Sequence, residues 1–173
     1  MSEARPYHVL FLCTGNSARS IFAEALINAM GRGRFRGFSA GSHPEDQPHP
    51  VTLAVLEESL HDVSGLRSKH WSEFSGEHAV PLDFVFTVCD RAAAEPCAVW
   101  PSQPITAHWG IQDPVALDLG EAADRDERMK PFRATFLALQ QRIALFTNLP
   151  LASLDRLAIQ AEVDRIGEGG TAQ

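Results

Sequence analysis

The chain has 173 residues, of which 45% are hydrophobic, and its formal net charge is -7. This length and composition are typical of one soluble globular domain that buries its own core. The negative charge repels a phosphate backbone, so we expect no nucleic-acid partner, and any oxyanion would need a local positive site. The apolar run from Val9 to Cys13 is too short for a signal peptide or a membrane span. We therefore expect a cytoplasmic protein without a membrane partner.

Short apolar runs alternate along the chain with stretches in which apolar residues recur at helical spacing. This alternation is typical of an α/β fold with a parallel sheet and right-handed crossovers. We see no internal repeat and no linker, so residues 1–173 are expected to form a single domain. The predicted strands cover residues 7–13, 34–40, 83–88 and 105–108, and the predicted helices cover residues 20–30, 51–60, about 121–146 and 151–166.

Two details of the predicted helices concern single residues. The apolar face of the helix over residues 51–60 is expected to include Leu60 as its last member. The long helix contains Pro131, where a bend is expected because proline lacks the backbone N–H group that a helix interior needs.

Three residues that can carry chemistry fall at or just past the ends of predicted strands. Cys13 ends the first strand, Cys89 follows the third, and Asp113 lies in the loop after the fourth. In open parallel sheets the ligand site lies beyond the carboxyl ends of the strands. We therefore expect these three residues to converge on one edge of the sheet.

The segment from Cys13 to Ser20 reads Cys-Thr-Gly-Asn-Ser-Ala-Arg-Ser and joins a strand to a helix. A tight loop containing Gly15 can turn its N–H groups inward around an anion, and the helix dipole points at the same place. Arg19 adds a planar fork of donors suited to phosphate or arsenate. This field is expected to lower the pKa of Cys13 from ~8.5 to about 3.5–7.5, which makes a nucleophile. The alternative is a buried cysteine followed by an arginine by chance.

These residues resemble the phosphate loop of the low-molecular-weight tyrosine phosphatase superfamily. Ser39-Ala40-Gly41 and Asp113-Pro114 look like two further signatures of that superfamily, and the resemblance covers roughly residues 7–147. It implies a three-layer fold with a four-stranded parallel sheet, to which the helix at about 151–167 is an addition. It also implies that Asp113 is a general acid, that Asn16 and Ser20 hydrogen-bond the Cys13 thiolate, and that the oxyanion is bound by Thr14, Gly15, Asn16, Ser17, Ala18, Arg19 and Ser20.

Within this superfamily the chain looks more like an arsenate reductase than a phosphatase. The phosphatase branch usually follows Asp-Pro with tyrosines that wall the cleft, but the single tyrosine of this chain is Tyr7, in the first predicted strand. Two further cysteines, Cys89 and Cys97, follow the third strand instead. The segment from His108 to Pro114 also resembles the arsenate reductases.

The resemblance implies a relay of three thiols without a metal or another cofactor. Cys13 attacks arsenate, Cys89 then attacks Cys13 and expels arsenite, and Cys97 moves the disulfide to the Cys89–Cys97 pair. An external reductant restores the thiols, either thioredoxin or glutaredoxin with a low-molecular-weight thiol. Since a disulfide needs Cα atoms roughly 4.4–6.8 Å apart, and a straight helix would separate these two by about 12 Å, we expect residues 89–97 to be mobile.

Other interpretations of these cysteines are simpler. Cys89 and Cys97 can be two small buried apolar residues. A structural zinc site is disfavoured because the chain has no Cys-x2-Cys pair. Two other functions remain open at this point: a phosphatase that uses Cys13, Arg19 and Asp113 alone, and a redox-sensing or oxyanion-binding protein without turnover.

Some relatives in this superfamily bind a monovalent cation beside the loop. Asn16, Glu24 and Ser39 stand at matching positions, while Lys69 takes the place of an acidic ligand. We expect the Lys69 ammonium to replace the cation and to brace Asn16 or Glu24; the alternative is a solvated surface lysine. Together with Ser20 these residues form the predicted support of the loop.

The remaining polar and terminal segments carry weaker expectations. His43, His49 and His70 lie in predicted loops and are expected to be solvated. The helix over residues 151–166 is expected to cover an apolar face, and dimerisation or docking of a reductant are alternatives.

Overall fold

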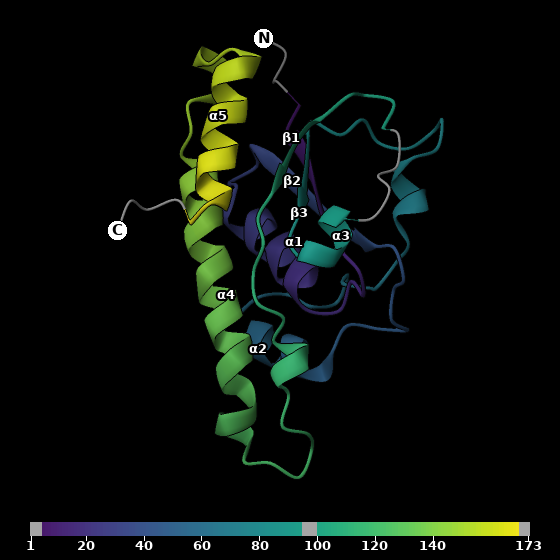
Figure 1. Ribbon diagram of the computed structural model, residues 1–173, viewed down its shortest axis with the longest axis vertical. Coiled ribbons are helices and arrows are strands. Elements are labelled where there is room, and N and C mark those ends of the chain that lie inside the picture. Colours follow the sequence, from purple (N-terminus) through teal and green to yellow (C-terminus); the bar gives the residue numbers. More distant parts are fainter. Residues whose placement is uncertain (1–4, 95–99, 170–173) are drawn as a thin grey trace.

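The computed structural model describes residues 5–94 and 100–169. At its centre lies a four-stranded sheet in the order β2-β1-β3-β4, in which all neighbouring strands are parallel (Figure 1). The sheet confirms the predicted α/β class. Its strands are β1 (Tyr7–Cys13), β2 (Phe35–Gly41), β3 (Phe84–Thr87) and β4 (Ile105–His108).

Five α-helices and three short 3-10 turns connect and flank these strands in the described part of the chain. The helices are α1 (Arg19–Met30), α2 (Pro50–Glu58), α3 (Asp90–Ala94), α4 (Arg125–Thr147) and α5 (Arg156–Gly167). The 3-10 turns are η1 (Trp71–Phe74), η2 (Val115–Leu117) and η3 (Leu151–Ser153). No helix among the described residues is both long and apolar enough to cross a membrane.

The helix boundaries differ from the sequence expectation where side chains cap the backbone. The long helix starts at Arg125 rather than near residue 121, because the Asp124 carboxylate accepts the N–H of Glu127. The predicted helix over 151–166 is divided: η3 comes first, and α5 begins only after Asp155, which accepts the N–H of Ala158. Helix α3 was not predicted, because its five residues are too few for a periodic pattern.

Leu60 was wrongly placed on the apolar face of the second helix. Helix α2 ends at Glu58, and Leu60 adopts a left-handed backbone with a φ of 65°. Its side chain is 94% exposed. Because the helix ends two residues earlier, Leu60 is not on its buried face.

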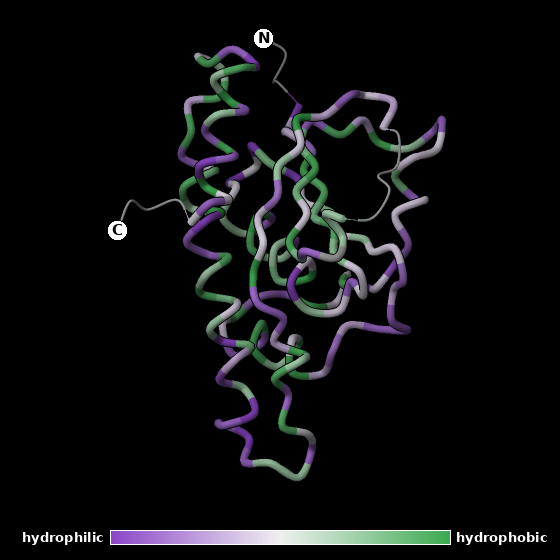
Figure 2. The backbone as a smooth tube through the Cα atoms, viewed as in Figure 1, coloured by the Kyte–Doolittle hydropathy of each residue, from purple (hydrophilic) through white to green (hydrophobic). Residues whose placement is uncertain are grey.

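The sheet separates two apolar clusters, so the fold has three layers. Alternate residues of β1 point to opposite faces: Val9 and Phe11 join the larger cluster beneath α1 and α4, and Leu10 joins the smaller one with Trp100. The strands therefore run as hydrophobic segments through the centre of the molecule (Figure 2). Burial of each large side chain contributes about 1.5–3 kcal/mol to folding.

Helix α5 packs along β4, the edge strand of the sheet. The Gln160 side chain donates a hydrogen bond of 2.8 Å to the Thr106 carbonyl, and the Trp109 indole N–H donates one of 3.0 Å to the Val163 carbonyl. A Cβ atom added at Gly167 would lie 2.3 Å from the carbonyl oxygen of His108. The helix therefore covers both the edge of the sheet and the fully buried Trp109.

Candidate active site

The loop between β1 and α1 is held by Asn16, which is fully buried and adopts a left-handed backbone with a φ of 48°. Its side-chain amide donates to Ser20 Oγ at 2.8 Å, and its side-chain oxygen accepts the N–H of Lys69 at 2.9 Å. The Ser68 hydroxyl donates to its backbone carbonyl at 2.6 Å. These bonds offset the strain of the left-handed conformation and fix the curvature of the loop.

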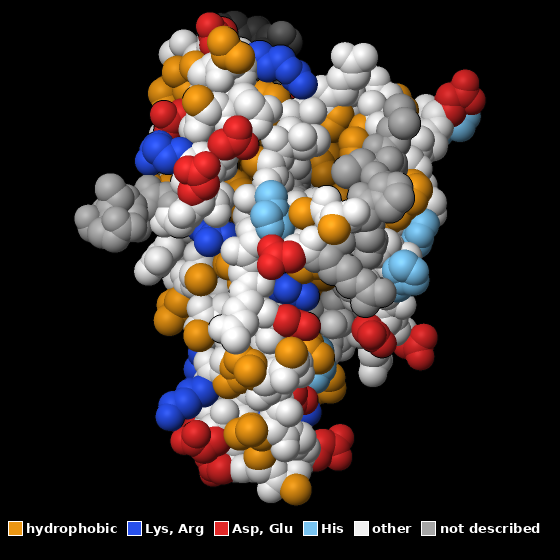
Figure 3. Space-filling model, viewed as in Figure 1, with side chains coloured by type: hydrophobic (Ala, Val, Ile, Leu, Met, Phe, Trp, Pro, Cys, Tyr) orange, Lys and Arg blue, Asp and Glu red, His pale blue; other side chains and the backbone are white. Residues whose placement is uncertain are grey.

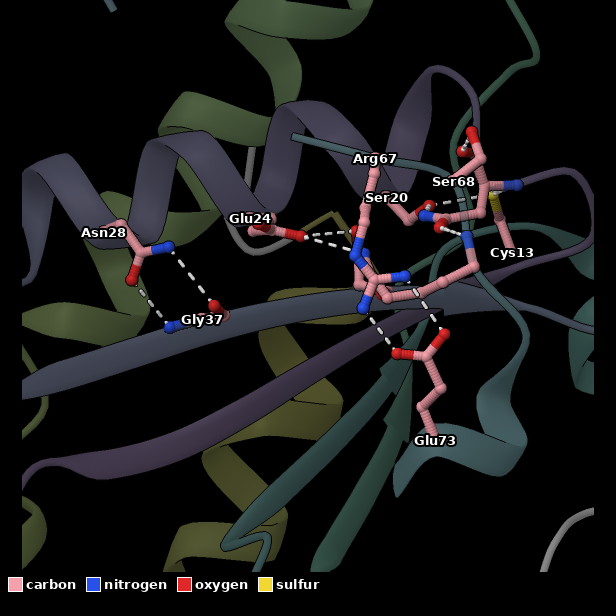
Figure 4. Close-up of polar contacts among 11 residues, drawn as sticks. Cys13, Ser20, Glu24, Asn28, Gly37, Arg67, Ser68 and Glu73 are labelled. Atoms are coloured by element: carbon pink, nitrogen blue, oxygen red, sulfur yellow. Dashed lines mark hydrogen bonds and ion pairs between the residues drawn. The ribbon is translucent and has the colours of Figure 1, made fainter. Parts of the chain in front are cut away.

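The thiol of Cys13 lies at the bottom of this loop and is 4% exposed. Its sulfur is 3.0 Å from Ser20 Oγ and accepts the N–H of Asn16 at 3.3 Å (Figure 4). The predicted lowering of its pKa is wrong for this structure: burial raises the pKa of the Cys13 thiol, while the hydrogen bond from Ser20 and the charge of Arg19 act in the opposite direction. Sequence reasoning counted the donors but not the loss of water.

Arg19 and Asp113 approach the loop from two different segments. The guanidinium of Arg19 donates to the Ile111 carbonyl at 3.1 Å and lies 3.5 Å from Asp113 Oδ2. The other carboxylate oxygen of Asp113 accepts the N–H of Val115 at 3.0 Å. The arginine thus connects the oxyanion loop to the loop after β4, and the Asp113 carboxyl group, 39% exposed, faces the cleft between them.

Cys89 lies beside the oxyanion loop, at the start of α3. Its sulfur is 3.6 Å from Thr14 Oγ1 and accepts the N–H of Ala92 at 3.3 Å. It is free and only 2% exposed. The predicted mobile segment, residues 89–97, extends into residues 95–99, which lie outside the described residues. Cys97 is one of these. A pairing of Cys89 with Cys97 therefore stays a prediction.

These groups line one cleft of about 560 Å³ at the carboxyl end of the strands. The predicted convergence of Cys13, Cys89 and Asp113 is thus observed, since all three line this cleft. Among the described lining residues, Arg19 is the only Arg or Lys, and Tyr, Phe and Trp are absent. The cleft is lined by Cys13, Thr14, Gly15, Ser17, Ala18, Arg19, His43, Glu45, Cys89, Asp90, Ile111, Gln112, Asp113 and Val115.

A second group of polar residues supports the loop from below. The Lys69 ammonium donates to the Ser39 carbonyl at 2.8 Å and lies 3.7 Å from Glu24 Oε1, which accepts the Ser39 hydroxyl at 2.6 Å. The Lys69 side chain is 8% exposed, so it is not a solvated surface lysine. Burial lowers the pKa of Lys69, and the Glu24 carboxylate raises it. The Gly41 backbone packs against the loop: an added Cβ would lie 2.4 Å from the Thr14 carbonyl oxygen.

Two histidines have hydrogen-bond partners that the sequence did not predict. His108 hydrogen-bonds Thr87 and Asp90, both at 2.8 Å, and so ties β4 to the start of α3. His49, expected to be solvated, is 15% exposed and bonded to Asp118. The position of His49 just before Pro50, a proline at a helix start, was a usable signal for a cap. Its partner 69 residues away was not predictable from local patterns.

The charged surface agrees with the net negative charge of the chain. On the face in Figure 3, Lys and Arg side chains are scattered among acidic ones, and acidic side chains gather where the N-terminal half of α4 lies. Within the described ranges, no group of three or more His, Cys, Asp or Glu side chains is placed to hold a metal ion. With Cys13 and Arg19 in its lining, the cleft can position a thiol against a small oxyanion that Arg19 and backbone N–H groups bind.

Known proteins resemble this chain in sequence and in fold. The family model described as low molecular weight phosphotyrosine protein phosphatase matches residues 8–157. Arsenate reductase 1 of Staphylococcus epidermidis is 30% identical over 129 residues, which cover 74% of this chain and 93% of that protein. A glutaredoxin arsenate reductase of Synechocystis sp. is 31% identical over 106 residues, covering 61% and 77% respectively. The crystal structure of an arsenate reductase from Archaeoglobus fulgidus superposes with a TM-score of 0.62 at 25% identity, covering 82% of this chain and 99% of that one.

Proposed function

The chain belongs to the low molecular weight phosphotyrosine protein phosphatase family. Within this family we propose that it is an arsenate reductase, which reduces arsenate to arsenite with its own cysteines. The observation that carries the proposal is the position of Cys89. This second buried thiol lines the same cleft as Cys13 and contacts Thr14 of the oxyanion loop. A phosphatase needs no such thiol.

Arsenate would be bound by the oxyanion loop, residues 14–20. The N-terminus of α1 offers unpaired N–H groups there, since its N-cap residue Ala18 provides no side-chain cap. Arg19 would turn from the Ile111 carbonyl to grip two arsenate oxygens with its fork of donors. The acidic residues Glu45, Asp90 and Asp113 around the cleft favour a small inorganic oxyanion over a phosphopeptide.

In the first chemical step the Cys13 sulfur attacks arsenic and a hydroxyl group leaves. The thiol gives its proton to the dianionic arsenate, and Asp113 protonates the leaving hydroxyl, which departs as water. The product is a Cys13–S–As(V) adduct. Asn16 and Ser20 hold the sulfur in line with the bound oxyanion during this step.

In the second step the Cys89 thiolate attacks the sulfur of Cys13. The S–S bond forms as the S–As bond breaks, and its electron pair stays on arsenic, which leaves as arsenite, As(III). Cys97 then attacks Cys89 and frees Cys13. Two thiols are oxidised to one disulfide for each two-electron reduction of arsenic, so the electrons balance.

An external dithiol must then reduce the Cys89–Cys97 disulfide. We propose thioredoxin, or glutaredoxin with a low-molecular-weight thiol, as the class of reductant; one relative of this chain is called a glutaredoxin arsenate reductase. A cycle that starts from free thiols suits the reducing cytoplasm, where we place the protein.

A single-turnover experiment tests the function without a choice of electron donor. Fully reduced protein is mixed with excess arsenate and quenched, and arsenite is measured together with the disulfides. We expect about one arsenite per chain and a Cys89–Cys97 disulfide. Cys97→Ser should release arsenite and stop at a Cys13–Cys89 disulfide, whereas Cys89→Ser should release none. Arsenite release that persists in Cys89→Ser would rule out the relay.

A steady-state assay then identifies the donor. NADPH oxidation is followed with thioredoxin reductase and thioredoxin, and in parallel with glutathione reductase, glutathione and glutaredoxin. Arsenate-dependent turnover in one system only would assign the donor. If the protein releases no arsenite but hydrolyses phenyl phosphate equally well with and without Cys89, it is a phosphatase.

A further inference from the structure

Three side chains, those of His49, Asp118 and Arg128, meet where the start of α2, the turn after η2 and α4 come together. The carboxylate of Asp118 accepts hydrogen bonds from His49 Nε2 at 3.1 Å and from Arg128 Nε at 2.7 Å and Nη2 at 3.0 Å. His49 and Asp118 are each 15% exposed, and Arg128 is 20% exposed. We call these three residues the carboxylate clamp.

His49 attaches the clamp to the oxyanion loop. Its ring Nδ1 accepts the N–H of Val51 at 3.1 Å, so the ring proton lies on Nε2 and is donated to Asp118. Its backbone N–H donates to the Ser17 carbonyl within the oxyanion loop at 3.0 Å. Its ring also packs on Phe132 of α4 in a tilted arrangement, with centroids 4.9 Å apart. Both the ring and the backbone of His49 are therefore fixed.

Arg128 attaches the clamp to α4. Its two parallel hydrogen bonds to Asp118 have the geometry of a fork on a carboxylate, which gives direction as well as strength. Asp118 Oδ1 also accepts the N–H of Gly120 at 3.1 Å, which closes the turn after η2. The Arg128 guanidinium, aided by this N–H and by His49, holds the pKa of Asp118 well below its usual range. The carboxylate is thus charged at every pH at which the protein would work.

Within the clamp, Asp118 lies five residues after Asp113 in the chain. On the other side of Asp113, Arg142 donates to the Gly110 carbonyl at 3.0 Å, a bond that does not involve the oxyanion site. Asp113 is therefore carried by a segment that is anchored at both ends. The anchor before Asp113 is the bond from Arg142 to the Gly110 carbonyl, and the anchor after it is Asp118.

We propose that His49, Asp118 and Arg128 are positioning residues that hold the Asp113 loop over the oxyanion loop for proton transfer. The proposal rests on the proposed function, in which Asp113 protonates the leaving oxygen. A general acid must lie within hydrogen-bond distance of that oxygen, and a displacement of about 1 Å can cost ~100-fold in rate. The clamp joins the segment of the acid to the segment of the nucleophile through one carboxylate.

Two variants weaken the clamp in different ways. Asp118→Asn removes the charge that Arg128 and His49 share but keeps the size of the side chain. His49→Asn keeps an acceptor for the Val51 N–H, because asparagine is a good N-cap. It removes the bond to Asp118 together with the ring contact to Phe132. The second variant serves if the first one does not fold.

The matched control is Glu58→Gln. Glu58 accepts a two-pronged hydrogen bond from Arg133, at 2.7 and 2.9 Å, and this pair also joins α4 to the end of α2. It is remote in sequence from the Asp113 loop. Its loss removes the same kind of arginine–carboxylate pair from α4 without touching the clamp.

The single-turnover rate of arsenite release is measured for these variants alone and combined with Asp113→Asn. We expect Asp113→Asn to lower the rate by about 100-fold and each clamp variant by ~10-fold. In the Asp113→Asn background the clamp variants should cause almost no further loss, because they act through that residue. The rate of Cys13 alkylation by iodoacetamide should stay as in wild type.

A clamp that only stabilises the fold would give a different pattern. The rate loss from a clamp variant would then multiply with the rate loss from Asp113→Asn, or the clamp variant would also change the rate of Cys13 alkylation. Either result overturns the proposal. So would equal effects of Glu58→Gln and Asp118→Asn. If the wild type releases no arsenite, the proposed function fails by itself, and the same comparison on phenyl phosphate hydrolysis still tests the clamp. A protein with neither activity would overturn both.

Discussion

The backbone N–H of Lys69 donates a hydrogen bond of 2.9 Å to the side-chain oxygen of Asn16. The same residue reaches Ser39 and Glu24 with its ammonium group. One lysine therefore supports the oxyanion loop twice, through its backbone and through its side chain. That this ammonium group replaces a bound cation stays a prediction.

Lys69→Met should lower the free energy of unfolding by about 1–3 kcal/mol, because Glu24 would keep a buried carboxylate without its cationic partner. Chemical denaturation measures this change. Activity of the wild type should be the same in sodium and potassium salts of equal ionic strength. Potassium-dependent activation of the wild type would contradict the idea that Lys69 replaces a cation.

Ser20→Ala should raise the pKa of Cys13 further, because the Ser20 hydroxyl is the contact that most lowers it against the effect of burial. In wild type the alkylation rate of Cys13 should rise only above the usual range of a thiol. In the variant the whole profile should move to higher pH, so alkylation at pH 7 becomes slower. Peptide mass spectrometry assigns the label to Cys13, and Cys13→Ser provides the blank.

An unchanged alkylation profile in Ser20→Ala would show that the hydroxyl does not stabilise the thiolate. A wild-type profile that rises well below the usual thiol range would show that the donors of the loop outweigh burial.

Arg19→Lys should raise the KM for arsenate by about 10–100-fold, the equivalent of roughly 1.5–3 kcal/mol for a lost hydrogen bond to a charged group. A lysine keeps the charge but cannot bind two oxygens at once. Steady-state kinetics with varied arsenate measures the change, and thermal unfolding checks the fold. A KM within twofold of wild type would exclude two-pronged binding by Arg19.

Ile166→Ala in α5 should cost ~2–4 kcal/mol of unfolding free energy, because this side chain is fully buried against the core. Leu157→Ala on the same helix is the control: its side chain is 82% exposed, and we expect a change within about 0.5 kcal/mol. Both variants should keep the wild-type rate of arsenite release at a temperature well below unfolding. A rate loss in Ile166→Ala without loss of stability would instead give α5 a role in the chemistry.

Much of this protein was predictable because its signals are local. Strands β1 and β4 were predicted with their observed bounds. Strand β1 is a short apolar segment that ends at a turn. The oxyanion loop was identified from eight consecutive residues, and the convergence of Cys13, Cys89 and Asp113 follows from the rule for parallel sheets.

The tertiary structure decided what depends on distant partners and on water. Lys69 became a buried support only because residues 16, 24 and 39 surround it. The pKa of Cys13 moved opposite to the prediction because a sequence shows the donors near a thiol but not its burial. His49 could not be paired with Asp118 from local patterns, because packing energy is shared among residues that are close only in the folded chain.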